Sequence, residues 1–324
     1  MRAVRVSEPG GPGAMQLEEV PDPSPGAGQV LVRVAAAGVN FIDTYQRSGA
    51  YPMETPFVLG LEGAGEIVAV GEGVDDAAVG RTVAWAGALG SYADLVVADA
   101  EAVVPVPDGV PAEAAAALML QGMTAHYLSH STFAVGRDDT ALVYAAAGGV
   151  GRLLTQLAVR RGARVIGLTS TDAKEAEARR LGADAVIRYR DEGVVISDEA
   201  RRLTDGRGVQ VVYDSVGADT FDQSLRSLAP RGTLVLFGQS SGPVPPIDLQ
   251  TLNQHGSLFV TRPSLGAYTA TPDELTWRAT SLFDLFAAGE LDVAIHERYP
   301  LEDAARAHED LASGSTSGKL LLVP

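Results

Sequence analysis

A glycine-rich segment, Tyr144-Ala-Ala-Ala-Gly-Gly-Val-Gly151, has the residue types and the spacing of a turn that holds a phosphate group. The apolar run Ala141–Ala145 predicts a short buried strand, and apolar residues then recur at helical spacing over residues 150–158. Glycines between a strand and a helix let the backbone approach a pyrophosphate, and the helix N-terminus points at it. The segment therefore predicts a dinucleotide-binding turn.

The glycine pattern is A-x-G-x-x-G at Ala146, Gly148 and Gly151, with alanine where the first glycine usually stands. Such turns also serve close helix–strand packing without any ligand. Here a strand precedes the turn, a helix follows it, and residues 164–168 predict a second strand at the distance of a βαβ unit. This context favours the dinucleotide site.

The end of the second strand indicates which dinucleotide binds. Thr169, Ser170 and Thr171 stand where an NAD-preferring site usually places an acid for the ribose 2′-hydroxyl, and Lys174 follows. A site without that carboxylate and with a nearby cation suits a 2′-phosphate, so the predicted cofactor is NADPH. The alternative is that Lys174, which lies in the charged run 172–180, belongs to a solvated helix face.

Two kinds of element position these residues. The first third predicts short strands at 1–6, 29–34, 65–70 and 81–86 with Gly- and Pro-rich turns between them, which indicates a compact barrel-like domain. An alanine-rich helix is expected from Pro111. From about residue 140, strands and helices alternate, which predicts a doubly wound parallel sheet. Its expected strands cover 141–145, 164–168, 185–188, 209–213, 233–237 and 257–261.

A helix is predicted at 272–288, and the last segment, 294–324, is a strand–helix–strand without a sheet of its own. We expect this segment to return to the first domain. The predicted fold class is α/β, with a β-rich catalytic domain at 1–118 and 292–324 and a cofactor domain at 119–291.

Composition limits the functions that remain. The 324 residues allow two domains, and 46% hydrophobic and 20% charged residues fit a soluble globular protein. The formal net charge of −16 argues against a nucleic-acid partner. The absence of cysteine excludes disulfides, thiol nucleophiles and cysteine-bound zinc. No secretion signal or membrane-spanning run is recognisable, so we expect a cytoplasmic protein without membrane contact.

Several motifs in one order resemble the zinc-independent quinone oxidoreductases, the zeta-crystallin-like branch of the medium-chain dehydrogenase/reductases. They are Gly38-Val-Asn-Phe-Ile-Asp-Thr-Tyr-Gln-Arg-Ser-Gly-Ala-Tyr51, the glycine turn, Tyr213-Asp-Ser-Val-Gly217, Phe237-Gly-Gln-Ser-Ser-Gly242 and Val260-Thr-Arg-Pro-Ser264. The resemblance covers nearly the whole chain. It implies a GroES-like catalytic domain, a Rossmann cofactor domain and hydride transfer from NADPH to a quinone.

The resemblance also concerns the metal of the alcohol-oxidising relatives. Gly60-Leu-Glu62 looks like their Gly-His-Glu segment with Leu61 in place of histidine. We expect no metal, and we expect Glu62 to form a structural ion pair or hydrogen bond. A quinone is already an electrophile, so its reduction needs less carbonyl polarisation than that of an aldehyde.

The resemblance assigns Asn40, Tyr45, Tyr51 and Thr124 to the nicotinamide and acceptor pocket. Asn40 and Thr124 would orient the cofactor amide or donate to the substrate, and the tyrosines would stack on a planar ring or bond to it. Each residue also has a structural alternative. Asn40 would cap a helix, the tyrosines would cover a surface, and Thr124 would be a packed helix residue.

For the cofactor, the resemblance assigns Gly148, Gly149, Val150 and Gly151 to the pyrophosphate, Ser170, Lys174 and Tyr189 to the 2′-phosphate, and Phe237, Gly238, Ser240 and Ser241 to the ribose–nicotinamide side. Tyr189 is alternatively a strand-end aromatic residue. The alternative for the last group is an ordinary turn after a strand. Some relatives have asparagine at the position of Gln239, so contacts in this loop differ among them.

In this family subunits commonly pair through the final strand of the cofactor sheet, so the resemblance implies a homodimer through Ser257–Thr261. Two other functions remain open. One is an NADPH-dependent reductase of enones or enoyl thioesters, and the other is a non-catalytic NADPH-binding protein of the crystallin or RNA-binding kind.

Overall fold

The computed structural model describes all residues from 1 to 324, and its contacts divide the chain into two compact units. Unit 1 comprises residues 1–123 and 269–324, and unit 2 comprises residues 124–268. The domain boundaries expected from the sequence differ from this division mainly over 269–291. The helix of this stretch, α9 (Pro272–Ala287), packs on strand β8 (Val103–Pro105) of unit 1.

Unit 1 is rich in β-structure, as the spacing of its short apolar runs predicts. Its larger sheet has the strand order β15-β16-β3-β5-β6-β8 with β7 also paired to β3, and its smaller sheet has the order β2-β1-β4. The strands are β1 (Arg2–Val6), β2 (Met15–Glu19), β3 (Gln29–Val39), β4 (Phe57–Val58), β5 (Glu62–Val70), β6 (Thr82–Ala86), β7 (Leu95–Asp99), β8, β15 (Ile295–Pro300) and β16 (Lys319–Val323). The helices are α1 (Phe41–Ser48), α2 (Ala112–Tyr127, which continues into unit 2), α9 and α10 (Ala304–Ser313).

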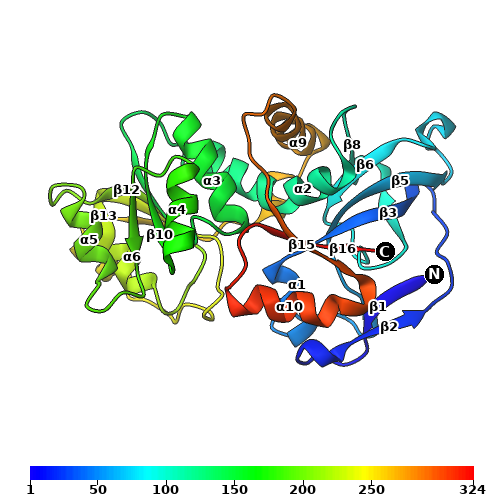
Figure 1. Ribbon diagram of the computed structural model, residues 1–324, viewed down its shortest axis with the longest axis horizontal. Coiled ribbons are helices and arrows are strands. Elements are labelled where there is room, and N and C mark those ends of the chain that lie inside the picture. The colour runs from blue at the N-terminus through cyan, green and yellow to red at the C-terminus, as the bar shows by residue number, and fades with distance from the viewer. The chain divides into compact units, whose positions relative to one another are not determined.

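Strand β3 is the centre of the larger sheet. Its alternating valines are buried, and it pairs antiparallel with β5, β7 and β16. In Figure 1 the C-terminal strand β16, at the red end of the colour range, lies beside the blue strand β3, and Leu320 is opposite Val39. The last strand of the chain therefore belongs to the larger sheet of unit 1.

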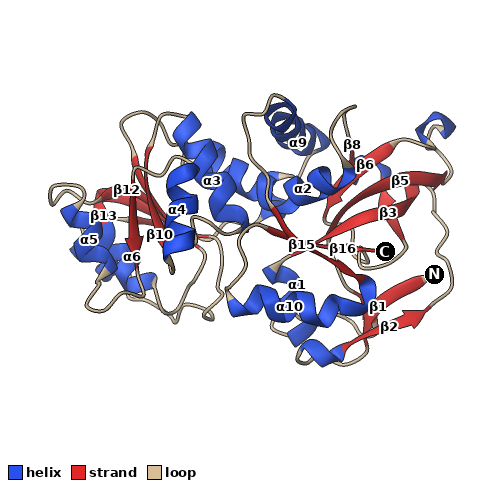
Figure 2. Cartoon of the chain, in the orientation of Figure 1, coloured by secondary structure: helices blue, strands red, loops and turns tan.

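Unit 2 contains one six-stranded sheet in which every neighbouring pair is parallel. The order β11-β10-β9-β12-β13-β14 is 3-2-1-4-5-6 in order of appearance, the arrangement of a Rossmann fold. Figure 2 shows helices flanking these strands. The strands are β9 (Thr140–Val143), β10 (Arg164–Thr169), β11 (Ala185–Arg188), β12 (Val209–Asp214), β13 (Leu228–Leu236) and β14 (Phe259–Thr261). The helices are α3 (Gly149–Arg160), α4 (Asp172–Arg180), α5 (Ile196–Arg202), α6 (Phe221–Ser227), α7 (Gln250–Gln254) and α8 (Leu265–Tyr268).

Two predicted strands are shorter in the structure than in the sequence analysis. Strand β9 ends at Val143 because Ala145 has φ 50° and turns the chain toward α3. Strand β14 begins at Phe259, after Ser257 with φ 60°. In both cases a residue with a positive φ turns the chain next to the end of the strand. Among the helices, none combines the length and the apolar character that crossing a membrane requires.

Candidate active site

The glycine turn joins β9 to α3, as predicted, at the point where the strand order of the sheet reverses. Gly148 is the N-cap residue of α3, and no side chain caps the first N–H groups of the helix. A Cβ on Gly151 would lie 2.1 Å from the carbonyl oxygen of Ala145, so a side chain there requires the backbone to move. Uncapped N–H groups beside bare backbone form a surface suited to a pyrophosphate.

The carboxyl ends of β10 and β11 bring the residues expected at the 2′-phosphate to one edge of the sheet. Thr169 and Arg188 are opposite each other in the parallel register, so Ser170 and Tyr189 leave the two strands side by side. The Tyr189 N–H donates to the Thr169 carbonyl at 3.2 Å. Lys174 lies in the first turn of α4, which begins directly beyond Ser170.

Two cations lie close together at this edge. Burial lowers the pKa of the half-buried Lys174 ammonium, and the positive charge of Arg190 lowers it further. The Arg190 guanidinium carbon lies 5.9 Å from the centre of the Tyr189 ring. Arg190 was not among the residues expected from the sequence, although it directly follows Tyr189. A pair of neighbouring cations favours a doubly charged anion such as a phosphate monoester.

The acidic side chains near this edge are held by another residue. Arg188 forms ion pairs with Asp172, with Glu175 at 3.5 Å and with Asp191 at 2.7 Å. A single guanidinium therefore contacts all three carboxylates. Lys174 and Arg190 lie at the same edge as two further cations.

The segment after β13 packs directly on the segment after β12. A Cβ on Gly238 would lie 2.4 Å from the Ser215 carbonyl oxygen, so glycine permits this close approach. The Ser241 hydroxyl donates to the Val216 carbonyl at 2.9 Å and accepts from the Asp219 N–H at 3.1 Å. Ser241 thus joins the two segments, and its hydroxyl is already engaged.

Asp214, the last residue of β12, organises both segments and was not expected from the sequence. Its buried carboxylate accepts from the Val216 N–H at 2.7 Å and from the hydroxyls of Thr220 and Ser224 at 2.8 and 2.7 Å. Its carbonyl oxygen accepts from the Phe237 N–H at 2.8 Å. In the sequence, Asp214 is only a single acidic residue at the end of a predicted strand, and such a residue cannot be distinguished from one at the surface.

In unit 1, helix α1 presents an aromatic group. The ring centroids of Tyr45 and Tyr51 lie 5.3 Å apart, and the Tyr51 N–H donates to the Tyr45 carbonyl at 3.0 Å. Phe41, which is 40% exposed, places its ring 6.4 Å from that of Tyr45. Sequence reasoning named both tyrosines and missed Phe41. Three neighbouring rings of this kind can receive a planar ligand.

Asn40 is the N-cap residue of α1, and its buried carboxamide is saturated by protein partners. Its Nδ2 donates to Glu62 Oε2 at 2.8 Å and to the Gly38 carbonyl at 3.3 Å. Its Oδ1 accepts from Lys319 Nζ at 2.8 Å and from Gln121 Nε2 at 3.1 Å. Two donated and two accepted bonds use the whole capacity of an amide, which leaves no group for the cofactor or substrate contact that the resemblance implied.

Glu62 forms the buried ion pair that the sequence analysis expected, and its partner is Lys319. Both side chains are almost without solvent exposure, at 0% and 2%. The second carboxylate oxygen of Glu62 accepts from the Leu120 N–H. Lys319 and Gln121 were missed because nothing near either residue in the sequence indicates a partner as distant as Asn40.

A second buried chain of hydrogen bonds supports the start of α1. Arg47 can only donate, so its 3.1 Å contact makes His308 Nδ1 an acceptor, and His308 Nε2–H then donates to the Tyr92 hydroxyl at 3.1 Å. Tyr92 in turn donates to Asp43 Oδ2 at 2.9 Å, which also accepts from the Asn40 N–H at 2.8 Å.

Burial dominates the titration of this chain. It raises the pKa of Asp43 to about 7 and lowers the pKa of His308 to about 3. The positive charge of Arg47 lowers the His308 pKa further. His308 is therefore neutral at pH 7, which agrees with the tautomer that Arg47 imposes.

The remaining expected site residue, Thr124, lies in α2 with 8% exposure, three residues beyond Gln121 and thus on the same face of the helix.

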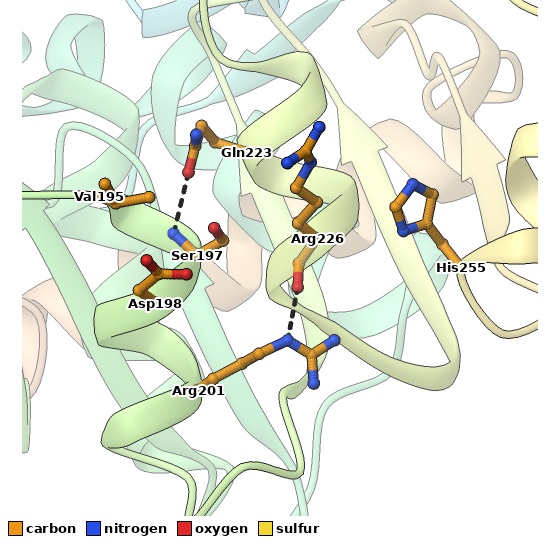
Figure 3. A pocket seen from close by; sticks show the side chains of 7 residues that line it. All are labelled: Val195, Ser197, Asp198, Arg201, Gln223, Arg226 and His255. Atoms are coloured by element: carbon orange, nitrogen blue, oxygen red, sulfur yellow. Dashed lines mark hydrogen bonds between the residues drawn. The ribbon is translucent and has the colours of Figure 1, made fainter.

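A separate open pocket of 320 Å³ lies on unit 2, beside α5 and α6 (Figure 3). Arg201 there donates to the Arg226 carbonyl at 2.9 Å, and Arg226 pairs with Asp222 at 2.8 Å. None of the expected cofactor residues lines this pocket.

Comparison with known proteins identifies the family. The model described as an alcohol dehydrogenase GroES-like domain matches residues 26–108, and the model described as a zinc-binding dehydrogenase matches residues 181–322. A quinone oxidoreductase of Pseudomonas aeruginosa is 45% identical, over 100% of this chain and 99% of that protein. The chain belongs to the quinone oxidoreductase family.

Two further relatives inform the chemistry. The Escherichia coli quinone oxidoreductase, solved in complex with NADPH, is 42% identical and superimposes with a TM-score of 0.97, covering all of both chains. A 2-haloacrylate reductase from a Burkholderia species is 40% identical over 99% of this chain and 98% of that protein. The resemblance to this family is therefore confirmed.

The zinc in the name of one family model does not fit the residues of this chain. Zinc sites in proteins are built from cysteine, histidine and carboxylate ligands, and this chain has no cysteine and has Leu61 before Glu62. The Glu62 carboxylate is already neutralised by Lys319 and bonded to Asn40. No group of three or more histidine, aspartate or glutamate side chains is arranged to hold a metal.

Proposed function

We propose that this chain is an NADPH-dependent quinone oxidoreductase that reduces a quinone to the hydroquinone. The observation that carries the proposal is the identity of 45% with a quinone oxidoreductase over the whole chain. The overall reaction balances as quinone + NADPH + H⁺ → hydroquinone + NADP⁺. NADPH supplies the hydride when it is bound, and the chain's own residues bind and orient the reactants.

The cofactor residues follow from unit 2. Gly148, Gly149, Val150 and Gly151 would bind the pyrophosphate through backbone N–H groups. Ser170, Lys174 and Tyr189, joined by Arg190, would bind the 2′-phosphate. The proximity of the two cations supports this assignment, since no acidic residue occupies the end of β10.

The remaining cofactor residues are Phe237, Gly238, Ser240 and Ser241, which we assign to the ribose–nicotinamide side. The Ser241 hydroxyl is engaged with Val216 and Asp219, so Ser241 would act by shaping the loop. The close approach at Gly238 supports a backbone surface there.

For the acceptor, we propose that Tyr45 and Tyr51 contact the quinone ring together with Phe41. The neighbouring rings of Phe41 and Tyr45 on α1 and of Tyr51 just after it support this assignment. Asn40 would act by holding the start of α1, since its carboxamide is saturated, and Thr124 is the candidate donor to the nicotinamide amide or the acceptor oxygen. No dedicated proton donor is evident among these residues, and we propose that solvent supplies the proton.

The test is NADPH oxidation, followed at 340 nm, with a naphthoquinone, a short enone and an enoyl thioester in parallel. We expect the quinone to give the highest kcat/KM. NADPH binding without oxidation by any acceptor would refute the enzymatic proposal and favour the non-catalytic alternative.

A second candidate function is the reduction of activated alkenes. The relative named 2-haloacrylate reductase favours it, because its substrate carries a carbon–carbon double bond conjugated to a carboxylate. Turnover of the enone or thioester that equals or exceeds quinone turnover in the same panel would place this function first.

We also propose a homodimer through β14. This strand is the edge of the unit 2 sheet, and Phe259 on it is 61% exposed. Light scattering after size exclusion should give twice the 33.7 kDa chain mass, and Phe259→Lys should shift the protein to monomer. A single species near the chain mass in the unmodified protein would refute the dimer.

We further propose that the protein belongs to the zeta-crystallin-like branch and acts in the cytoplasm, where NADPH is a common reductant. The leucine at position 61 supports the assignment to a branch without catalytic zinc. Fractionation of the native host should recover the protein with cytoplasmic markers, and recovery in another compartment would refute the location.

A further inference from the structure

We propose that Lys319 is a positioning residue for quinone reduction. The buried Lys319 ammonium holds the Asn40 carboxamide. Through Asn40 it fixes the first turn of α1, where Phe41 and Tyr45 lie. The inference rests on the proposed function only for its kinetic readout. Its structural readout, the stability of α1, is independent of activity.

Three neighbouring strands deliver the parts of this cluster. Lys319 begins β16, Glu62 begins β5, and both strands flank β3, which ends one residue before Asn40. A Cβ on Gly38 of β3 would lie 2.0 Å from Glu62 Oε2 and 2.7 Å from Lys319 Cε. The backbone of β3 therefore packs directly against the ion pair, and no side chain fits between them.

The charges of the cluster fix the orientation of the Asn40 carboxamide. Its oxygen faces two donors, Lys319 Nζ and Gln121 Nε2, and its nitrogen faces the Glu62 carboxylate. Rotation of the amide by 180° would set its NH₂ group against an ammonium and its oxygen against a carboxylate. Only one orientation is therefore compatible with the ion pair.

From Asn40 the constraint passes to the helix that presents the rings. Asn40 is the N-cap residue of α1, and Phe41 and Tyr45 are the first and fifth residues of that helix. The Asn40 N–H also donates to Asp43 at 2.8 Å, so the backbone at this point is held from two sides. Loss of Lys319 would release the carboxamide and leave the Asp43 contact alone.

The competing explanation is that Lys319 only stabilises the fold. Without Lys319, the buried Glu62 carboxylate would have no counter-charge, which would strongly destabilise the folded protein. Two variants separate the explanations. Lys319→Met leaves Glu62 unpaired, whereas the double variant Glu62→Gln with Lys319→Met removes both charges. If Lys319 only neutralises Glu62, the double variant should have the kinetics of the wild type. If Lys319 positions Asn40, the double variant should remain impaired, because the carboxamide has lost the ammonium that holds it.

The experiment measures the unfolding midpoint, the KM for the naphthoquinone and the Kd for NADPH. These are compared for both variants and for the control Arg298→Met. Arg298 lies on β15, the strand beside β16, and its replacement removes an exposed ion pair with Glu113 of α2. We expect the double variant to unfold near the wild-type denaturant midpoint. Its KM for the naphthoquinone should rise by about tenfold or more. Its Kd for NADPH should stay within about twofold, because the expected cofactor residues other than Asn40 and Thr124 lie on other elements. Arg298→Met should change none of these values.

Hydrogen exchange supplies the readout that does not depend on activity. Amides of residues 41–48 should exchange faster in the double variant, while those of β9 and β10 keep the wild-type rates. An unchanged KM with unchanged exchange over 41–48 would overturn the inference. If wild-type protein does not reduce quinones but α1 still loosens, the proposed function fails and the positioning role stands.

Discussion

Replacement of Lys174 by alanine tests the cofactor assignment at the residue that distinguishes NADPH from NADH. A hydrogen bond to a charged group contributes about 1.5–3 kcal/mol, and the half-exposed position of Lys174 reduces this to about 1–2 kcal/mol. Lys174→Ala should therefore weaken NADPH binding by about 5- to 30-fold. NADH lacks the 2′-phosphate, so its Kd should change by less than about twofold.

The assay is a fluorescence titration of the reduced cofactors at low and high salt. Arg202→Ala is the matched control, because it removes the same charge from an exposed pair with Glu199 on α5. The NADPH preference should decrease with salt in the wild type and depend less on salt in Lys174→Ala, where Arg190 remains. Equal affinity of the unmodified protein for both cofactors, or equal weakening of both by Lys174→Ala, would refute the reasoning.

Three further outcomes follow from the structure. Gly151→Val should abolish binding of both NADPH and NADH in the same titration, because its Cβ would meet the Ala145 carbonyl oxygen at 2.1 Å; retained affinity would contradict a pyrophosphate role for the turn. Asp43 has a pKa raised to about 7, so its contribution to stability is present at low pH and is lost as pH rises through 7. Asp43→Asn should therefore gain stability relative to wild type between pH 4 and 7.5, by as much as a few kcal/mol in urea unfolding, and a pH-independent difference would contradict this pKa. Phe41→Ala should raise the quinone KM several-fold with kcat less affected, whereas an unchanged KM would remove Phe41 from the acceptor site.

The parts of the site that sequence predicts well are those built from consecutive residues. The glycine turn, the strand before it and the helix after it lie within about 20 residues, so their pattern is local and the structure has the predicted elements. The sequence also predicts that Glu62 forms an ion pair or a hydrogen bond, because a carboxylate that binds no metal needs another polar partner when it is buried. It does not predict that the partner is Lys319.

The residues missed by sequence reasoning are those whose partners lie far along the chain. Lys319 and Asn40 are 279 positions apart, and only the pairing of β16 with β3 brings them together. Asp214 and Arg190 resemble ordinary charged residues at strand ends until the neighbouring loops and cations are in place. The same limit applies to α9, whose packing on β8 assigns it to unit 1 by contacts.

The most direct test of the central claim is the stoichiometry of the reaction in metal-depleted protein. The enzyme is dialysed against a chelator and incubated without oxygen with NADPH and a naphthoquinone. We predict one hydroquinone formed for each NADPH oxidised, at a rate that added zinc does not increase. Loss of turnover on chelation with recovery on zinc addition, or the absence of NADPH oxidation, would contradict the account.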